Sequence, residues 1–342
     1  ANITTGTDNV AIGQNALNQS STGSENIAIG TQSLYTNTAG KRNIAIGLYS
    51  QNAGNLTVEG QISNNVAIGY STSYHNVTGT ANTAIGNQAM KGVSGQSHSL
   101  NTAVGHSSLY SVTNGQQNSA VGNTSLYSNT SGNFNVGMGY ESSAYNQTGT
   151  KNTAIGHSAL RGVSGNSHSN NTAVGYQSMY PVTTGGNNTA LGYQSLRAIT
   201  SGSGDVGLGV QANYSVTTGV QNVAVGQGAL FYNQTGHYNT AVGGSAMGGA
   251  LGNSHENNTA VGYASLNSIT TGGNNTTLGY RTLATATTAN YNVAIGKDAM
   301  EYIPAGQAIA NVVAIGIASV KGSSSTTTGI NGTVAIGLSS LT

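Results

Sequence analysis

The chain has 342 residues, of which only 5% are Asp, Glu, Lys or Arg, and its formal net charge is +1. Soluble domains typically carry roughly 25% charged residues, so Asn, Gln, Ser, Thr and Gly must cover most of this surface. The near-neutral charge argues against binding to nucleic acid or to an anionic membrane surface. The absence of Cys excludes disulfides and thiolate metal sites, and no apolar run is long enough to predict membrane insertion in this segment.

One motif, Asn-x-Ala-(Ile/Val)-Gly, recurs along the whole chain. Twelve of the eighteen spacings between successive motif glycines are 17 residues, and the others are 19 to 22 residues. A period near 20 is typical of solenoid proteins, in which each repeat forms one coil. The nineteen motif glycines are Gly13, Gly30, Gly47, Gly69, Gly86, Gly105, Gly122, Gly139, Gly156, Gly175, Gly192, Gly209, Gly226, Gly243, Gly262, Gly279, Gly296, Gly316 and Gly337.

Two apolar rows repeat with the motif. The residue before the glycine is Ile, Val, Leu or Met in all nineteen repeats, and the residue before that is Ala in sixteen. This alternation has the period of a strand, and we expect the large residue to lie in the core. A second apolar row, mostly Leu and Met, follows four residues after the glycine, and a polar turn such as 37–40 comes next. We therefore predict two short strands and two turns per coil.

These patterns predict an all-β fold, a parallel β-solenoid or β-roll of about 19 coils with a 17-residue repeat. It would form a single continuous repeat domain over residues 1–342. Stacking in register places the motif asparagines above one another at the strand spacing of about 4.8 Å, so their amides can bond in a ladder. The predicted ladder contains Asn9, Asn26, Asn43, Asn65, Asn82, Asn101, Asn118, Asn135, Asn152, Asn171, Asn188, Asn222, Asn239, Asn258, Asn275 and Asn292.

Insertions predict protruding loops at 52–63, 91–100, 161–170 and 248–257. The block 91–98 returns as 161–168 and, more loosely, as 248–255, and each copy ends in a histidine. His98, His168 and His255 are therefore candidates for contact with a receptor or surface. The alternative interpretation is a polar loop that was duplicated together with its coil.

Tyrosine follows the motif glycine in six repeats, at Tyr70, Tyr140, Tyr176, Tyr193, Tyr263 and Tyr280. An exposed row of this kind can stack on sugar rings, which makes Tyr176 and Tyr193 further candidates for receptor contact. The alternative is that these rings cover a corner of the coil or an oligomer interface.

The sequence argues against catalysis. A glycosidase needs two carboxylates within about 5–10 Å, and the eight acidic residues are scattered over different repeats, with Asp298 and Glu301 the pair nearest in sequence. The glycine-rich segments lack the Lys-Ser/Thr that completes a phosphate-binding loop. We expect no enzyme activity, no catalytic residues, no cofactor and no metal site.

The apolar content of one coil is small for an isolated solenoid. Ordering 17 residues costs on the order of 25 kcal/mol, whereas each of about two large apolar side chains contributes roughly 1.5–3 kcal/mol. Sharing a core among chains would offset this deficit, so we expect homo-oligomers.

Segments such as 80–86 and 118–132 resemble the tail-fibre repeats of phages and the head repeats of trimeric autotransporter adhesins. The resemblance covers essentially the whole chain and implies a homotrimeric extracellular fibre, on a virion tail or a bacterial surface, that presents a face to a cell-surface glycan or protein receptor. The coil is longer than that of the adhesin heads. The alternative is an extracellular filament or matrix subunit that stacks end to end, because open strand edges invite pairing.

Overall fold

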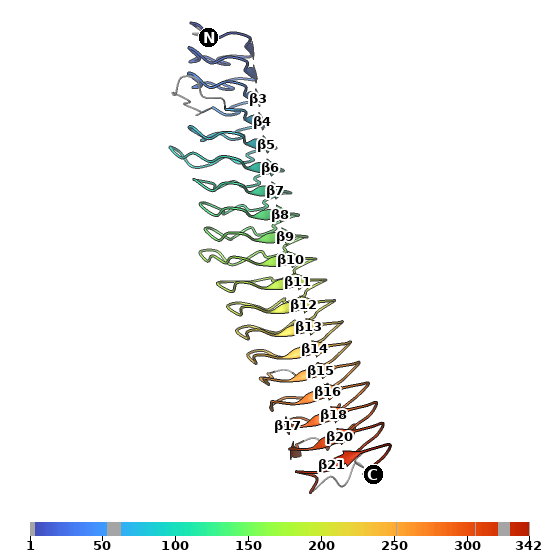
Figure 1. The fold of residues 1–342 in the computed structure, drawn as a ribbon. Helices are drawn as coiled ribbons and strands as arrows, with labels where there is room; N and C mark the ends of the chain where they lie inside the picture. Colours follow the sequence, from blue (N-terminus) through green and yellow to red (C-terminus); the bar gives the residue numbers. More distant parts are fainter. Residues whose placement is uncertain (1–3, 53–62, 251, 305, 321–328, 342) are drawn as a thin grey trace. The chain divides into compact units, whose positions relative to one another are not determined.

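The computed structural model describes residues 4–52, 63–250, 252–304, 306–320 and 329–341. Over these residues the fold is a parallel β-solenoid without helices, as predicted. The chain divides into two compact units, residues 1–170 and 171–342. Figure 1 shows that, within each unit, every coil places a short strand below the strand of the coil before it.

The described residues of the first unit form nine strands, each of three residues. In chain order they are β1 Val10–Ile12, β2 Ile27–Ile29, β3 Ile44–Ile46, β4 Val66–Ile68, β5 Thr83–Ile85, β6 Thr102–Val104, β7 Ser119–Val121, β8 Val136–Met138 and β9 Thr153–Ile155. Consecutive strands pair in parallel and in register, so that each motif position lies next to its own equivalent.

Where the second unit is described, it repeats this arrangement with ten coil strands and a short second ladder. The coil strands are β10 Thr172–Val174, β11 Thr189–Leu191, β12 Val206–Leu208, β13 Val223–Val225, β14 Thr240–Val242, β15 Thr259–Val261, β16 Thr276–Leu278, β18 Val293–Ile295, β20 Val313–Ile315 and β21 Val334–Ile336. The second ladder pairs β17 Thr288–Asn290 with β19 Ala308–Ala310. The prediction of about 19 coils with a 17-residue repeat is therefore confirmed.

The predicted core row is wrong. The large residue before the motif glycine points outward, as in Ile12, Met138 and Leu191, whose exposed fractions are 58%, 42% and 51%. The alanine in the middle of the strand is buried instead, because alternate residues of a strand point to opposite faces. The coil interior has room only for a small side chain there. Even at Gly137 an added Cβ would lie 2.5 Å from Ser125 Oγ.

The second apolar row does form the core. Its leucines and methionines, including Leu126, Leu160 and Met179, are fully buried against the alanines. The expectation that this row lies on a second strand is wrong, because these residues have φ near +50° and belong to a series of turns. Branching at Cβ is poorly tolerated at positive φ, which explains why the apolar members of this row are Leu and Met, with Val320 the exception among the described residues, while the strands are rich in Val and Ile.

The motif asparagines lie in one buried ladder in each unit. In the first unit, Asn135 donates its Nδ2 to Asn118 Oδ1 at 3.2 Å and to the Gly149 carbonyl at 2.9 Å, and its backbone N–H also donates to Asn118 Oδ1. One amide thus joins the strand of its own coil to the preceding strand and to the turn that follows.

Candidate functional site

The outer strand face, which we define as the first and third residues of each coil strand, presents a regular series of exposed and half-buried apolar side chains. Its members are mainly Val, Ile and Thr, and their side chains are exposed or half-buried in both units. In-register pairing makes, within each unit, one row of Ile, Val, Leu and Met from the third strand residues and one mixed row, of Val or Ile with Thr or Ser, from the first. A contiguous exposed apolar surface of this kind is typical of an interaction site.

The tyrosines that follow the motif glycines lie on the surface of the single chain. Tyr176 and Tyr193 are exposed, and their ring centroids lie 5.5 Å apart with planes 9° from parallel. Tyr263 and Tyr280 form a similar pair at 5.6 Å. The structure therefore brings candidate contact residues from successive coils together.

The three histidines are not surface residues, which corrects the expectation for His98, His168 and His255. Their exposed fractions are 1%, 2% and 0%, because each takes the place of a turn glycine and its carbonyl accepts the amide of a ladder asparagine. Burial lowers the pKa of each imidazole to about 4. Both ring nitrogens of His98 and His168 lack a hydrogen-bond partner, so these side chains fill space inside the coil.

The loops themselves lie at the surface. An added Cβ at Gly95 or Gly165 would meet nothing within 4 Å, and Val93 and Val163 are exposed. The loop at 248–257 is described except for residue 251, whereas 53–62, nearly all of the loop predicted at 52–63, lies outside the described residues.

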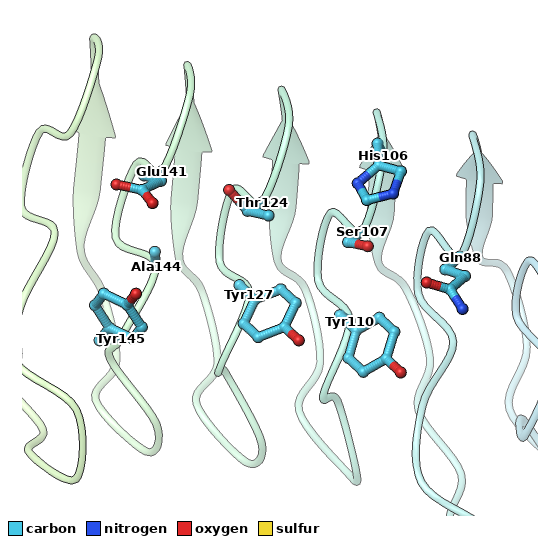
Figure 2. A pocket seen from close by; sticks show the side chains of 9 residues that line it. All are labelled: Gln88, His106, Ser107, Tyr110, Thr124, Tyr127, Glu141, Ala144 and Tyr145. Atoms are coloured by element: carbon cyan, nitrogen blue, oxygen red, sulfur yellow. The ribbon is translucent and has the colours of Figure 1, made fainter.

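A row that the sequence analysis missed lies five residues after the motif glycine. In the first unit this row includes Lys91, Tyr110, Tyr127 and Arg161, and it borders a pocket of about 420 Å³ that Tyr145 also lines. Figure 2 shows the rings of Tyr110 and Tyr127 side by side on successive coils, below a row of shorter polar side chains. The signal was present in the sequence, because aromatic and cationic residues concentrate at this one position of the repeat.

Charged groups in this region are paired. Glu141 Oε2 accepts a hydrogen bond from Arg161 Nε at 2.8 Å, and the Arg161 guanidinium also lies 4.6 Å from the Tyr145 ring centroid. Lys91 Nζ donates to the Tyr110 hydroxyl at 3.1 Å. Within the described residues, no three His, Cys, Asp or Glu side chains gather as metal ligands would.

Comparisons with known proteins leave the chain without an assigned relative. No family model, no curated protein and no solved structure matches it. The part of the chain that the structure describes also contains no helix of the length and apolarity that a membrane span requires.

Proposed function

We propose that the chain is a segment of a homotrimeric extracellular attachment fibre, on a virion tail or a bacterial surface. The observation that carries the proposal is the outer strand face, which exposes a regular row of Ile, Val, Leu and Met while the alanines and the Leu and Met row fill the coil. Apolar rows that follow successive coils are suited to side-by-side packing with further copies of the same chain, because every copy presents the same spacing. The repeat resemblance described above favours three copies.

Oligomer mass tests the association. We expect three times the mass of one chain in solution, and we expect Val121→Asn combined with Ile155→Asn to lower it. The matched control is Val163→Asn, because Val163 and Ile155 are exposed to nearly the same extent, 37% and 38%, but only Ile155 lies on a strand. A monomer at micromolar concentration, or equal loss of association in the control, would contradict a shared strand face.

Attachment needs a separate measurement. Beads coated with the purified chain are expected to adhere to bacteria or to animal cells, and Tyr176→Ala with Tyr193→Ala is expected to weaken adhesion if these exposed rings contact the receptor. Beads that adhere to neither cell type, together with long threads of the free chain in electron micrographs, would favour the end-to-end filament subunit instead.

A further inference from the structure

We propose that the groove beside Tyr110 and Tyr127 binds a neutral saccharide chain that lies across successive coils. The groove lies within the first unit of one chain, so this inference stands whether or not the chain forms a trimer. It concerns a different row of side chains from the tyrosines that follow the motif glycines.

The two rings are nearly parallel and offset-stacked, so they form a stepped platform. Their centroids are 5.1 Å apart and their planes differ by 14°. Figure 2 shows the two rings next to each other along the stack of coils, each with part of one face turned toward the viewer. The C–H face of a pyranose packs on an aromatic face of this kind. Successive rings are separated by about the strand spacing of 4.8 Å, which is close to the advance of an extended β-1,4-linked chain per sugar.

Polar side chains border the platform at the position two residues after each motif glycine. Gln88, Ser107, Thr124 and Glu141 occupy this position on four successive coils and line the same pocket. Amide, hydroxyl and carboxylate groups at the edge of an aromatic surface are the groups that recognise sugar hydroxyls, since each donates or accepts hydrogen bonds. The pocket volume of about 420 Å³ lies in the range of small-ligand sites.

Charge in the groove favours a neutral ligand. The Arg161 cation is held by Glu141 and by the Tyr145 ring, and the Lys91 cation is held against Tyr110. A polyanion needs several unpaired cations along its path, and of these two cations Arg161 is already paired with the Glu141 carboxylate. The two cations instead lie at the two ends of the aromatic row, where Lys91 contacts Tyr110 and Arg161 contacts Tyr145.

The same position recurs in the second unit. Tyr214 and Phe231 lie five residues after their motif glycines, with ring centroids 4.8 Å apart and planes 8° from parallel. Phe231 also lines a pocket of about 270 Å³, and Arg197 lies over the Tyr180 ring. Two independent occurrences of paired rings, a flanking cation and a pocket at one repeat position indicate a shared use.

The test is titration of the full chain with chitohexaose and cellohexaose as neutral β-1,4-linked probes and with heparin as a polyanion, followed by calorimetry. We expect a neutral probe to bind, and Tyr110→Ala combined with Tyr127→Ala to weaken it at least about tenfold, as the loss of two stacking contacts implies. Tyr127→Phe keeps the ring and is expected to retain binding. Phe134→Ala is the control, since Phe134 is an exposed aromatic residue of the same unit outside the groove.

Circular dichroism of each variant separates loss of fold from loss of binding. Binding that survives removal of both rings overturns the proposal. Binding of heparin alone also overturns it. So does the failure of both neutral probes to bind, if a wider glycan array is also negative. Saccharide binding and oligomer mass are measured separately. A trimer that binds no saccharide contradicts this inference alone, and a monomer that binds saccharide contradicts the trimeric fibre alone.

Discussion

Among single residues, Asp205 departs most from its neighbours. It replaces asparagine in the ladder of the second unit, where its Oδ1 accepts hydrogen bonds from the backbone N–H and the Nδ2 of Asn222 at 2.9 and 3.0 Å. Its Oδ2 is buried without a partner. Asn188 and Asn222 donate to a glycine carbonyl from the corresponding atom, so only a protonated Asp205 can imitate them. Burial accordingly raises the pKa of this carboxyl from 3.8 to about 7.

The presence of Asp instead of Asn at position 205 predicts that the stability of the fold depends on pH. An acid whose pKa is higher in the folded state stabilises the fold below its unfolded pKa, and this contribution is lost as the pH rises through about 7. We expect Asp205→Asn to raise stability at pH 8 by of order 4 kcal/mol and at pH 5 by less than half as much, because the carboxyl of the unfolded chain is already mostly ionised at pH 5. Melting temperatures of both proteins at the two pH values check this, and an equal pH dependence in the two proteins would contradict it.

The buried histidines predict the opposite response to acid. A base whose pKa is lowered to about 4 by burial stabilises the fold above pH 6.5, and this contribution is lost as the pH falls through about 4. We expect the coils that contain His98 and His168 to open first in acid. Hydrogen exchange at pH 7 and pH 4.5, corrected for intrinsic rates, should rise more in peptides covering 91–100 and 161–170 than in peptides covering 122–139. Uniform change along the chain would argue against this role of the imidazoles.

At the level of one coil, backbone conformation decides which apolar residue fits. Leu126 is fully buried at a φ of +51°, whereas Ile155 lies in strand β9. We expect Leu126→Ile to destabilise the protein by about 1–2 kcal/mol, because a side chain branched at Cβ is strained in the left-handed region. Leu126→Met keeps an unbranched Cβ and is expected to cost less than about 1.5 kcal/mol. Denaturant midpoints compare the two variants with Ile155→Leu as a strand control, and equal costs for Ile and Met at position 126 would refute the conformational explanation.

Sequence periodicity was sufficient to predict the coil count, the parallel register and the alignment of the asparagines, because each depends on spacing alone. It was not sufficient to choose the inner face of the strand. Alternation shows that Ile27 and Ile29 share a face opposite Ala28, and the pattern is the same whichever face is inside. Which face is inside depends on the width of the coil, and that width is determined by the conformation of all seventeen residues of the repeat. The preference for Leu and Met in the other row was a usable sign of positive φ, while the burial of His98 depended on a long turn that folds back into the coil.

For the whole assembly, the outer strand face predicts that thermal stability depends on protein concentration. Association stabilises the folded chain by mass action, so the melting temperature should rise as the concentration is raised from micromolar to hundreds of micromolar. Val121→Asn with Ile155→Asn should flatten this dependence, whereas Val163→Asn should preserve it. A concentration-independent melting temperature in the unmodified protein would show that the face stays open to solvent.

The uniform register of the ladders has a consequence for how the chain finds its fold. In the regular coils, a strand would make nearly the same contacts with a neighbour one repeat away as with its correct one, since Ala, Ile or Val and Asn recur at the same positions. The repeat by itself therefore does not specify which coils become neighbours. The 19-residue coils, each with a histidine enclosed where other coils have glycine, are the places where a shifted alignment would bury the wrong side chain or leave a hole. Because these coils are separated by four and then by five coils, a chain aligned out of register would mismatch them, which disfavours register shifts while the coils assemble.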